Sequence, residues 1–97
     1  MAGDEKELGA EIFKVVGPRI AARRLELGLN QEELADLTGL HRTAISPLES
    51  GKRGVRLVNA FRLAAALRTT MPELFDGVYW DLDGEEFTDQ PPGTSDP

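Results

Sequence analysis

The sequence contains no cysteine and only one histidine, His41, among its 97 residues. Without thiols the chain has no disulfide, no cysteine nucleophile and no thiolate zinc site, and a single imidazole cannot build a histidine-based metal site. No uninterrupted apolar run is long enough to cross a bilayer. Because the sequence also lacks a glycine-rich phosphate loop and a spaced pair of carboxylates, it predicts neither an enzyme nor a cofactor.

Apolar residues make up 40% and charged residues 29% of the chain, which is typical of one soluble globular domain with a modest core. The first residues, Met1 to Glu7, are polar and acidic. A signal peptide has a basic region followed by an apolar one, so this segment does not resemble one. We therefore expect a cytoplasmic protein that makes no membrane contact and is stabilised by packing.

Basic residues are also scarce, with 11 against 17 acids and a net charge of -6, which by itself argues against a nucleic-acid partner. The charge is distributed unevenly, however. Residues 19–56 contain seven bases and five acids, whereas residues 76–97 contain seven acids and no base. Any surface that binds DNA is therefore expected in the middle of the chain.

Helical spacing of apolar residues predicts an N-terminal helix from Asp4 to Val16. The dipeptide Gly17-Pro18 is expected to interrupt it, because proline lacks an N–H and its ring clashes with the preceding helical turn. Proline is tolerated in the first turn of a helix, so a second helix is predicted from Pro18 to Leu27.

Two short helices are predicted next, over Gln31–Thr38 and His41–Glu49. Asn30 and Glu33 form the pattern of a capping box before the first, and Gly39 supplies the positive φ of a tight turn before the second. Two short helices joined by such a turn are typical of the helix-turn-helix, in which the second helix enters the major groove of DNA. The side chains expected in the core are Leu34, Ala35, Leu37, Ile45 and Leu48.

The composition of residues 50–54 predicts a loop, and an apolar helix is predicted from Leu57 to Leu67. Leu57 and Phe61 are expected on its buried side. Thr70 is the expected cap of a short last helix that ends near Gly77.

Beyond Gly77 the apolar period changes from helical to alternating. Val78 to Leu82, a two-residue turn at Asp83-Gly84, and Glu85 to Thr88 predict a β-hairpin. From Asp89 onward the composition predicts a disordered acidic tail. The expected organisation is an N-terminal helical extension (1–17), a helix-turn-helix DNA-binding domain (18–76), a hairpin or dimerisation segment (77–88) and the tail (89–97).

Two runs of residues carry a family pattern: Arg24-Leu-Glu-Leu-Gly-Leu-Asn-Gln-Glu-Glu-Leu-Ala35 and Ile45-Ser-Pro-Leu-Glu-Ser-Gly-Lys52. They resemble the Arg-x-x-x-Gly-Leu-(Ser/Asn)-Gln-x-x-Leu-Ala and Ile-x-x-x-Glu-x-Gly-x runs of the lambdoid phage repressor and Xre family of bacterial regulators. Two further runs are closer to the controller proteins of restriction-modification systems and their stand-alone relatives, namely Gly39-Leu-His-Arg-Thr43 and Arg53-Gly-Val-Arg-Leu-Val-Asn59.

The resemblance covers residues 16–75 and implies an all-α, five-helix, lambda-repressor-like domain that dimerises and binds near-palindromic operators. To this domain the chain adds the N-terminal helix and the short C-terminal β-hairpin. The implied partner is double-stranded DNA.

Base contacts are implied for Arg42 and Thr43, in the first turn of the second motif helix. Arginine can donate two hydrogen bonds to the O6 and N7 atoms of guanine, and the threonine methyl group can contact thymine. An ordinary solvated helical turn is the alternative interpretation.

Phosphate contacts are expected where helix N-termini and basic side chains face the DNA backbone. The candidates are Gln31, His41, Lys52, Arg53, Arg56, Arg19 and Arg23. Other interpretations stay open: Gln31 can simply extend the capping box, His41 can cap its own helix, and the basic residues can be solvated surface charges.

Two further groups of residues have predicted structural roles, one in an ion pair and one in a dimer interface. Arg24 and Glu49 occupy positions that pair beneath the motif in the family, and such a pair orients helices more reliably than it adds net stability. The residues expected in the dimer interface are Met71, Leu74, Phe75, Val78 and Trp80.

Pro47 is the main departure from the family, which often places a polar or basic DNA contact at this position. Proline has no side-chain donor and removes the backbone hydrogen bond to Thr43. Base contacts are then expected mainly from the first turn, and the helix is expected to kink or to loosen into a turn.

The leading hypothesis is a homodimeric, sequence-specific transcriptional regulator, a repressor or autoregulator rather than an activator. The alternative is a protein-binding module, such as an antitoxin that holds a basic partner with its acidic C-terminal segment. Net charge and Pro47 favour the alternative, whereas Gln31, Arg42 and the basic loop oppose it. We expect the acidic end to be a solubilising segment; the competing hypothesis is an autoinhibitor that folds onto the basic loop.

Overall fold

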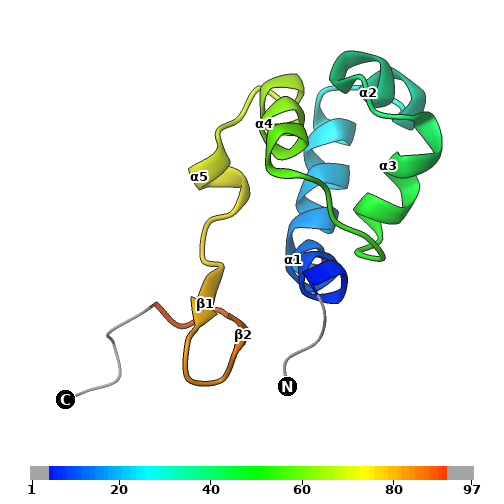
Figure 1. Ribbon diagram of the computed structural model, residues 1–97. Coiled ribbons are helices and arrows are strands. Elements are labelled where there is room, and N and C mark those ends of the chain that lie inside the picture. Colours follow the sequence, from blue (N-terminus) through cyan, green and yellow to red (C-terminus); the bar gives the residue numbers. More distant parts are fainter. Residues whose placement is uncertain (1–4, 92–97) are drawn as a thin grey trace.

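The computed structural model describes residues 5–91, and their side chains from Ala10 onward. Its elements are α1 Glu5–Glu26, α2 Gln31–Thr38, α3 Arg42–Glu49, α4 Leu57–Ala66, α5 Met71–Leu74, β1 Tyr79–Asp81 and β2 Glu86–Thr88. In Figure 1, α2 and α3 lie to one side of α1, α5 and the hairpin lie to the other, and α4 lies between these groups. The mostly helical domain with a small C-terminal hairpin is confirmed.

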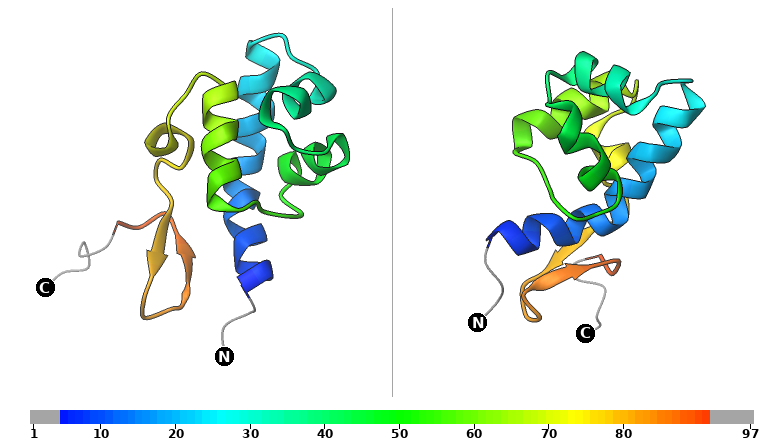
Figure 2. Two further views of the ribbon diagram at one scale, coloured as in Figure 1. Left: turned by 45° about the horizontal axis from the view of Figure 1, so that its top comes forward. Right: turned by 90° about the vertical axis from the view of Figure 1, so that its right-hand side faces the viewer.

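α1 runs without a break through Gly17 and Pro18, so the predicted interruption is wrong. Phe13 and Val16 before the proline and Ile20 after it belong to one buried core, and this packing outweighs the hydrogen bond that proline removes. The right-hand view of Figure 2 shows α1 changing direction in its N-terminal part, as proline-containing helices do. The predicted extension and the first helix of the motif domain are therefore one element.

Gly17 lies where the backbone of α1 approaches the end of α3. A Cβ atom at this position would collide with the carbonyl oxygens of Leu48 and Glu49. Across the same contact, a Cβ atom on Gly51 would lie 2.8 Å from the Cα atom of Lys14. Two glycines thus let the two backbones touch, and this contact fixes the position of α3 on α1.

We expect Gly17→Ala to lower the free energy of unfolding by about 1–3 kcal/mol, because the added methyl group meets backbone atoms that cannot rotate away. The matched control is Ala22→Gly at an exposed position of α1, which is expected to cost about 1 kcal/mol through helix propensity alone. Alanine is therefore the stabilising residue at position 22 and the destabilising one at position 17. Urea unfolding measures both, and a Gly17→Ala variant as stable as the wild type would contradict the close contact.

The start of α2 is the predicted capping box. The Asn30 side chain accepts from the Glu33 N–H at 2.7 Å, and the Glu33 carboxylate accepts from the Asn30 N–H at 2.9 Å. Gly39 ends the helix with a φ of 77°. The sequence predicts a buried Leu37, but this side chain is 60% exposed. Thr38 takes the inward position instead, since its hydroxyl donates to carbonyl groups of the preceding turn.

α4 turns Ala60, Leu63 and Ala64 into the core. Leu57 and Phe61, predicted to face inward, are 69% and 56% exposed. Because α4 is apolar around most of its circumference, the helical period alone does not identify its buried face. The exposed apolar side chains of α4, here called the α4 apolar face, are Leu57, Val58 and Phe61.

The two strands pair antiparallel, with Trp80 opposite Phe87. Their rings meet edge to face with centroids 5.0 Å apart, and β2 packs against α1. Residues 89–91 follow β2 without helix or strand, and the rest of the predicted tail, residues 92–97, lies outside the described residues.

The predicted two-residue hairpin turn is wrong, because four residues, 82–85, connect the strands. The Asp81 carboxylate accepts from the N–H of Asp83 at 3.1 Å, which forms an Asx turn at the end of β1. Glu85, rather than Gly84, adopts a positive φ, of 52°. The connection is therefore a four-residue loop that begins with a side-chain hydrogen bond and ends with a left-handed residue.

Candidate nucleic-acid interface

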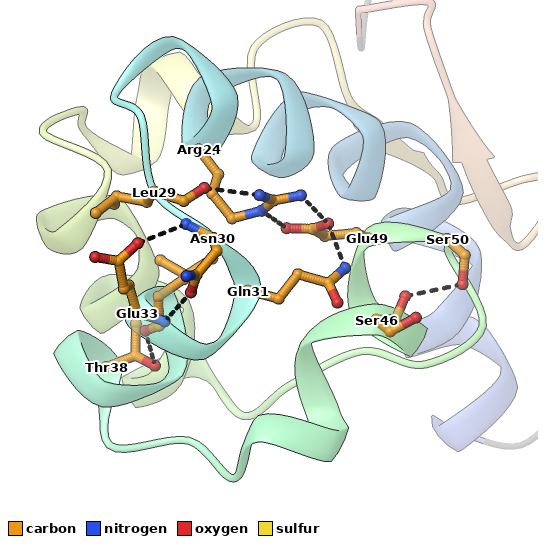
Figure 3. A network of polar contacts seen from close by, with 10 residues as sticks. Arg24, Leu29, Asn30, Gln31, Glu33, Thr38, Ser46, Glu49 and Ser50 are labelled. Atoms are coloured by element: carbon orange, nitrogen blue, oxygen red, sulfur yellow. Dashed lines mark hydrogen bonds and ion pairs between the residues drawn. The ribbon is translucent and has the colours of Figure 1, made fainter.

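Arg24 and Glu49 form a bidentate ion pair beneath the two motif helices (Figure 3). The Arg24 Nε and Nη2 atoms donate to the two Glu49 carboxylate oxygens at 2.6 and 3.0 Å, and the side chains are 11% and 8% exposed. The remaining Nη1 atom donates to the Leu29 carbonyl at 2.8 Å. The hydrogen bonds to Glu49 raise the pKa of Arg24 above its ordinary value. The pair that the sequence predicts thus ties α1 to the last turn of α3.

Gln31 extends this network, because its Nε2 atom donates to Glu49 Oε1 at 3.0 Å (Figure 3). The side-chain amide group of Gln31 therefore has a structural role: it holds the start of α2 against the end of α3. Within the part of the chain that the structure describes, the backbone N–H groups of Gln31 and Glu32 donate to no acceptor. A helix N-terminus with two free N–H groups favours a phosphate oxygen.

His41 caps α3. Its Nδ1 atom lies 3.2 Å from the Thr43 N–H and 2.7 Å from the Thr43 hydroxyl. Because Nδ1 accepts the backbone hydrogen bond, the neutral ring carries its proton on Nε2, which can donate to a phosphate. The two interpretations of His41 are therefore compatible. Thr43 uses its hydroxyl for this cap, and its methyl group remains to contact a base.

Arg42 is the first residue of α3 and its side chain is 71% exposed. The Nη1 atom lies 3.5 Å from the carboxylate of Glu32 on α2. An exposed pair of this length contributes less than about 1 kcal/mol, so a base can displace the carboxylate. The pair holds the guanidinium group near the start of α2, on the outer surface of the motif.

Sequence reasoning misses one exposed residue of α3, Ser46. It lies one helical turn beyond Arg42, and its hydroxyl has no hydrogen-bond partner among residues 5–91. The signal is its spacing of four from Arg42, which places both side chains on one face. Ser46 is therefore a third candidate for contact with DNA.

Pro47 leaves α3 helical through Glu49, so the expected loosening into a turn is wrong. The Pro47 carbonyl accepts from the Lys52 N–H at 2.8 Å, which closes the end of the helix. Ile45 and Leu48 on either side are fully buried, and this packing holds the helical conformation despite the lost backbone bond.

The loop between α3 and α4 carries three exposed bases, Lys52, Arg53 and Arg56. Their side chains make no hydrogen bond or ion pair with any described residue. No acidic residue occurs in positions 50–72, so this positive charge is uncompensated locally. Unpaired cations next to an exposed helix are suited to phosphate contacts.

Arg19 and Arg23 on α1 donate hydrogen bonds to backbone carbonyl groups elsewhere in the protein. Arg19 Nη1 donates to the carbonyls of Leu74 at 3.0 Å and Asp76 at 2.7 Å, and Arg23 Nε donates to the carbonyl of Leu67 at 2.8 Å. Carbonyl groups at helix C-termini carry partial negative charge and attract cations. The two arginines thus join α1 to the ends of α4 and α5, which favours a structural role for them over the predicted phosphate contacts.

We expect Arg23→Ala to lower the free energy of unfolding by about 1–2 kcal/mol, because it leaves carbonyls at the end of α4 without their donor. It should leave the salt dependence of DNA binding unchanged, since removing a phosphate contact would reduce the logarithmic slope by about 0.9. Arg53→Ala is the matched control and is expected to change the slope but not the stability. If both variants reduced the logarithmic salt slope equally, Arg23 would be shown to contact a phosphate.

The residues expected in the dimer interface divide into two groups. Leu74 is 4% exposed, and Phe75 packs on Phe13 with ring centroids 6.1 Å apart, so both belong to the core of the protomer. The others are half-buried: Met71, Val78 and Trp80. The most exposed large apolar side chains of the C-terminal half lie instead on the α4 apolar face and at Leu82.

No group of three or more histidine, aspartate or glutamate side chains within the described residues is arranged to hold a metal ion. Among the same residues, no helix has the length and apolarity needed to span a membrane.

Comparison with known proteins identifies related sequences. A model of the helix-turn-helix family matches residues 20–74. The control protein C.SmaI of Serratia marcescens is 38% identical over 64 residues, which cover 66% of this chain and 76% of that protein. The family match contains the whole motif and α4, and it leaves out the N-terminal part of α1 and the hairpin.

Solved structures give the same result. The restriction-modification controller protein C.AhdI from Aeromonas hydrophila superposes with a TM-score of 0.61 at 42% identity, covering 64% of this chain and 94% of that chain. The P22 c2 repressor, crystallised with a synthetic operator, superposes with a TM-score of 0.62 at 32% identity, covering 65% of this chain and 96% of that chain.

Proposed function

Because this chain belongs to the Xre-type helix-turn-helix family of DNA-binding transcriptional regulators, we propose that it is a homodimeric repressor or autoregulator that binds a near-palindromic operator. The observation that best supports the proposal is the set of unpaired bases, Lys52, Arg53 and Arg56, in the loop that follows α3, the helix whose first turn is exposed. The related P22 c2 repressor was crystallised with an operator, and C.SmaI is a control protein.

The exposed groups divide into two kinds of contact. Arg42 and the Thr43 methyl group are proposed to contact base edges, with Ser46 one turn further along α3. The phosphate contacts come from the backbone N–H groups at the start of α2, His41 Nε2–H and the basic loop. The Arg24–Glu49–Gln31 network beneath them fixes the distance between the two sets.

Dimerisation follows from the size of the recognition helix. α3 has eight residues, and one helix of this length contacts too few bases to select an operator. Two copies related by a two-fold axis would contact half-sites about 10 bp apart. The α4 apolar face supports the proposal, because three exposed large apolar residues on one helix are typical of an interaction surface.

The phosphate contacts are tested by replacing Lys52, Arg53 and Arg56 together with alanine. We expect weaker binding to all DNA sequences alike and a logarithmic salt slope reduced by about 0.9 for each phosphate that is no longer neutralised. The matched control exchanges lysine for arginine and arginine for lysine at the same positions, which keeps the charge and should keep the slope. Fluorescence anisotropy over a series of salt concentrations measures it, and an unaltered slope in the alanine variant would show that the loop does not contact DNA.

A further inference from the structure

The β-hairpin lies beyond residues 20–74, where the family model matches, so the family pattern does not account for it. The turn between its strands projects from the helical part of the molecule (Figures 1 and 2). Leu82 in this turn is 82% exposed. No base occurs after Arg68, and the acids next to Leu82 are Asp81, Asp83, Glu85 and Glu86. The hairpin turn thus presents one apolar side chain among carboxylates.

The α4 apolar face has the opposite charge character. Leu57, Val58 and Phe61 are 69%, 54% and 56% exposed. Arg62, directly after Phe61, and Arg68, beyond the end of α4, are exposed as well, and neither forms an ion pair with a described residue. With no acid in positions 50–72, the surface around α4 is apolar and basic.

We propose that the hairpin turn of one protomer docks on the α4 apolar face of a second copy, with Leu82 against the apolar side chains and its flanking carboxylates facing Arg62 and Arg68. The inference rests on the proposed homodimer and names the contact that forms it. A two-fold axis repeats the contact, so one dimer covers both hairpin turns and both α4 faces.

The distribution of charge favours this contact over the two other two-fold contacts that the same surfaces could form. If α4 packed on α4 of the second copy, Arg62 and Arg68 would face the arginines of that copy. If hairpin packed on hairpin, carboxylates would face carboxylates. Like charges that face each other disfavour both interfaces. Of these three arrangements, the exchange of hairpin and α4 is the one that pairs apolar side chains with apolar ones and acids with bases.

The position of the hairpin favours the partner's α4 over that of the same chain. The hairpin packs along the N-terminal part of α1, and α5 lies between it and α4 (Figures 1 and 2). The protomer is elongated, with principal extents of 47, 25 and 20 Å. Two such molecules lying side by side in opposite directions bring the hairpin of each to the α4 end of the other.

Site-directed cross-linking tests the contact, because the chain has no native cysteine. Leu82→Cys and Val58→Cys are made at exposed positions in two full-length chains with different tags, mixed, and treated with a short bis-maleimide. We expect the mixed product to exceed both symmetric products at least fivefold. A predominant Val58→Cys homodimer, or an intrachain product in the double variant, would overturn the proposal.

Sedimentation of the same samples separates two failures. A dimer that yields no mixed product overturns the docking of the hairpin and leaves the homodimer intact. A protein that remains monomeric at micromolar concentration, both free and on DNA, overturns the homodimer and with it the proposed contact.

Charge exchange provides a second readout. Arg62→Glu is expected to raise the dimer dissociation constant about tenfold, and adding Asp83→Lys is expected to restore most of the affinity, because each charge then again faces its opposite. Asp36→Lys, an exposed acid on α2, is the matched control and should have no effect. Failure of Asp83→Lys to rescue Arg62→Glu would contradict the proposed pairing.

Discussion

Arg42→Ala is expected to abolish the preference of the protein for its operator over a scrambled duplex while retaining non-specific binding. Arg42 opens α3 with a side chain that is 71% exposed and held only by a weak pair with Glu32. Removing a bidentate contact to guanine costs about 1–3 kcal/mol of discrimination for each half-site. Lys52, Arg53 and Arg56 keep their charge in this variant, so the salt-dependent affinity for any DNA should persist.

Two controls sharpen this expectation. Arg42→Lys keeps the charge without the planar pair of donors, so its discrimination should fall nearly as far as that of the alanine variant. Glu32→Gln removes only the internal partner of Arg42 and should leave discrimination intact. Competition binding with operator and scrambled duplexes measures all three variants, and unchanged discrimination in Arg42→Ala would refute the assignment of Arg42 as a base contact.

Glu49→Ala is expected to lower the free energy of unfolding by about 3–5 kcal/mol, because it leaves the Arg24 charge buried without its acceptor. Glu49 accepts two hydrogen bonds from Arg24 and a third from Gln31, at 2.6, 3.0 and 3.0 Å. Whole domains are stabilised by only about 5–15 kcal/mol, so this one change should approach the limit of folding at 37 °C.

The large loss of stability expected for Glu49→Ala depends on the burial of the Arg24–Glu49 pair, and Glu32→Gln in an exposed pair is the control. That variant removes a carboxylate from the exposed pair with Arg42 and should cost less than about 1 kcal/mol. Replacing Arg24 by methionine together with Glu49→Ala should recover part of the stability, since no buried charge remains. The pKa of Arg24 is higher in the folded protein than in the unfolded chain. The ion pair therefore contributes its full stabilisation at any pH below the ordinary arginine pKa, and this stabilisation is lost only as the pH rises through the raised pKa of the folded state. A decrease below about 1 kcal/mol for Glu49→Ala in urea unfolding would contradict this account.

The parts of the fold that the sequence predicts well depend on local chemistry. Asn30 and Glu33 satisfy each other's backbone groups within four residues, and Gly39 adopts the positive φ that its residue type favours. The hairpin follows from the change of apolar period after Gly77. The pairing of Arg24 with Glu49 has no local signal, and only the resemblance to the family predicts it.

The predictions that failed depend on contacts distant in the sequence. The residue type of Pro18 predicts the end of a helix, but core side chains on both sides of it hold α1 together. Leu57 and Phe61 have the spacing of buried residues, yet α4 packs through Ala60, Leu63 and Ala64. The structural role of Arg19 is not predicted by the sequence for a similar reason: its acceptors are backbone carbonyls 55 and 57 residues away, which no residue type reveals.

The central claim is that the chain selects a two-fold symmetric DNA sequence through the first turn of α3. Repeated selection of bound fragments from random duplex DNA, followed by sequencing, tests it most directly, with Arg42→Ala selected in parallel. The wild type should enrich a near-palindrome with half-sites about 10 bp apart, and the variant should lose the base preference within each half-site. Selection by the wild type that enriches no sequence, or the same sequence enriched by both proteins, would contradict the claim.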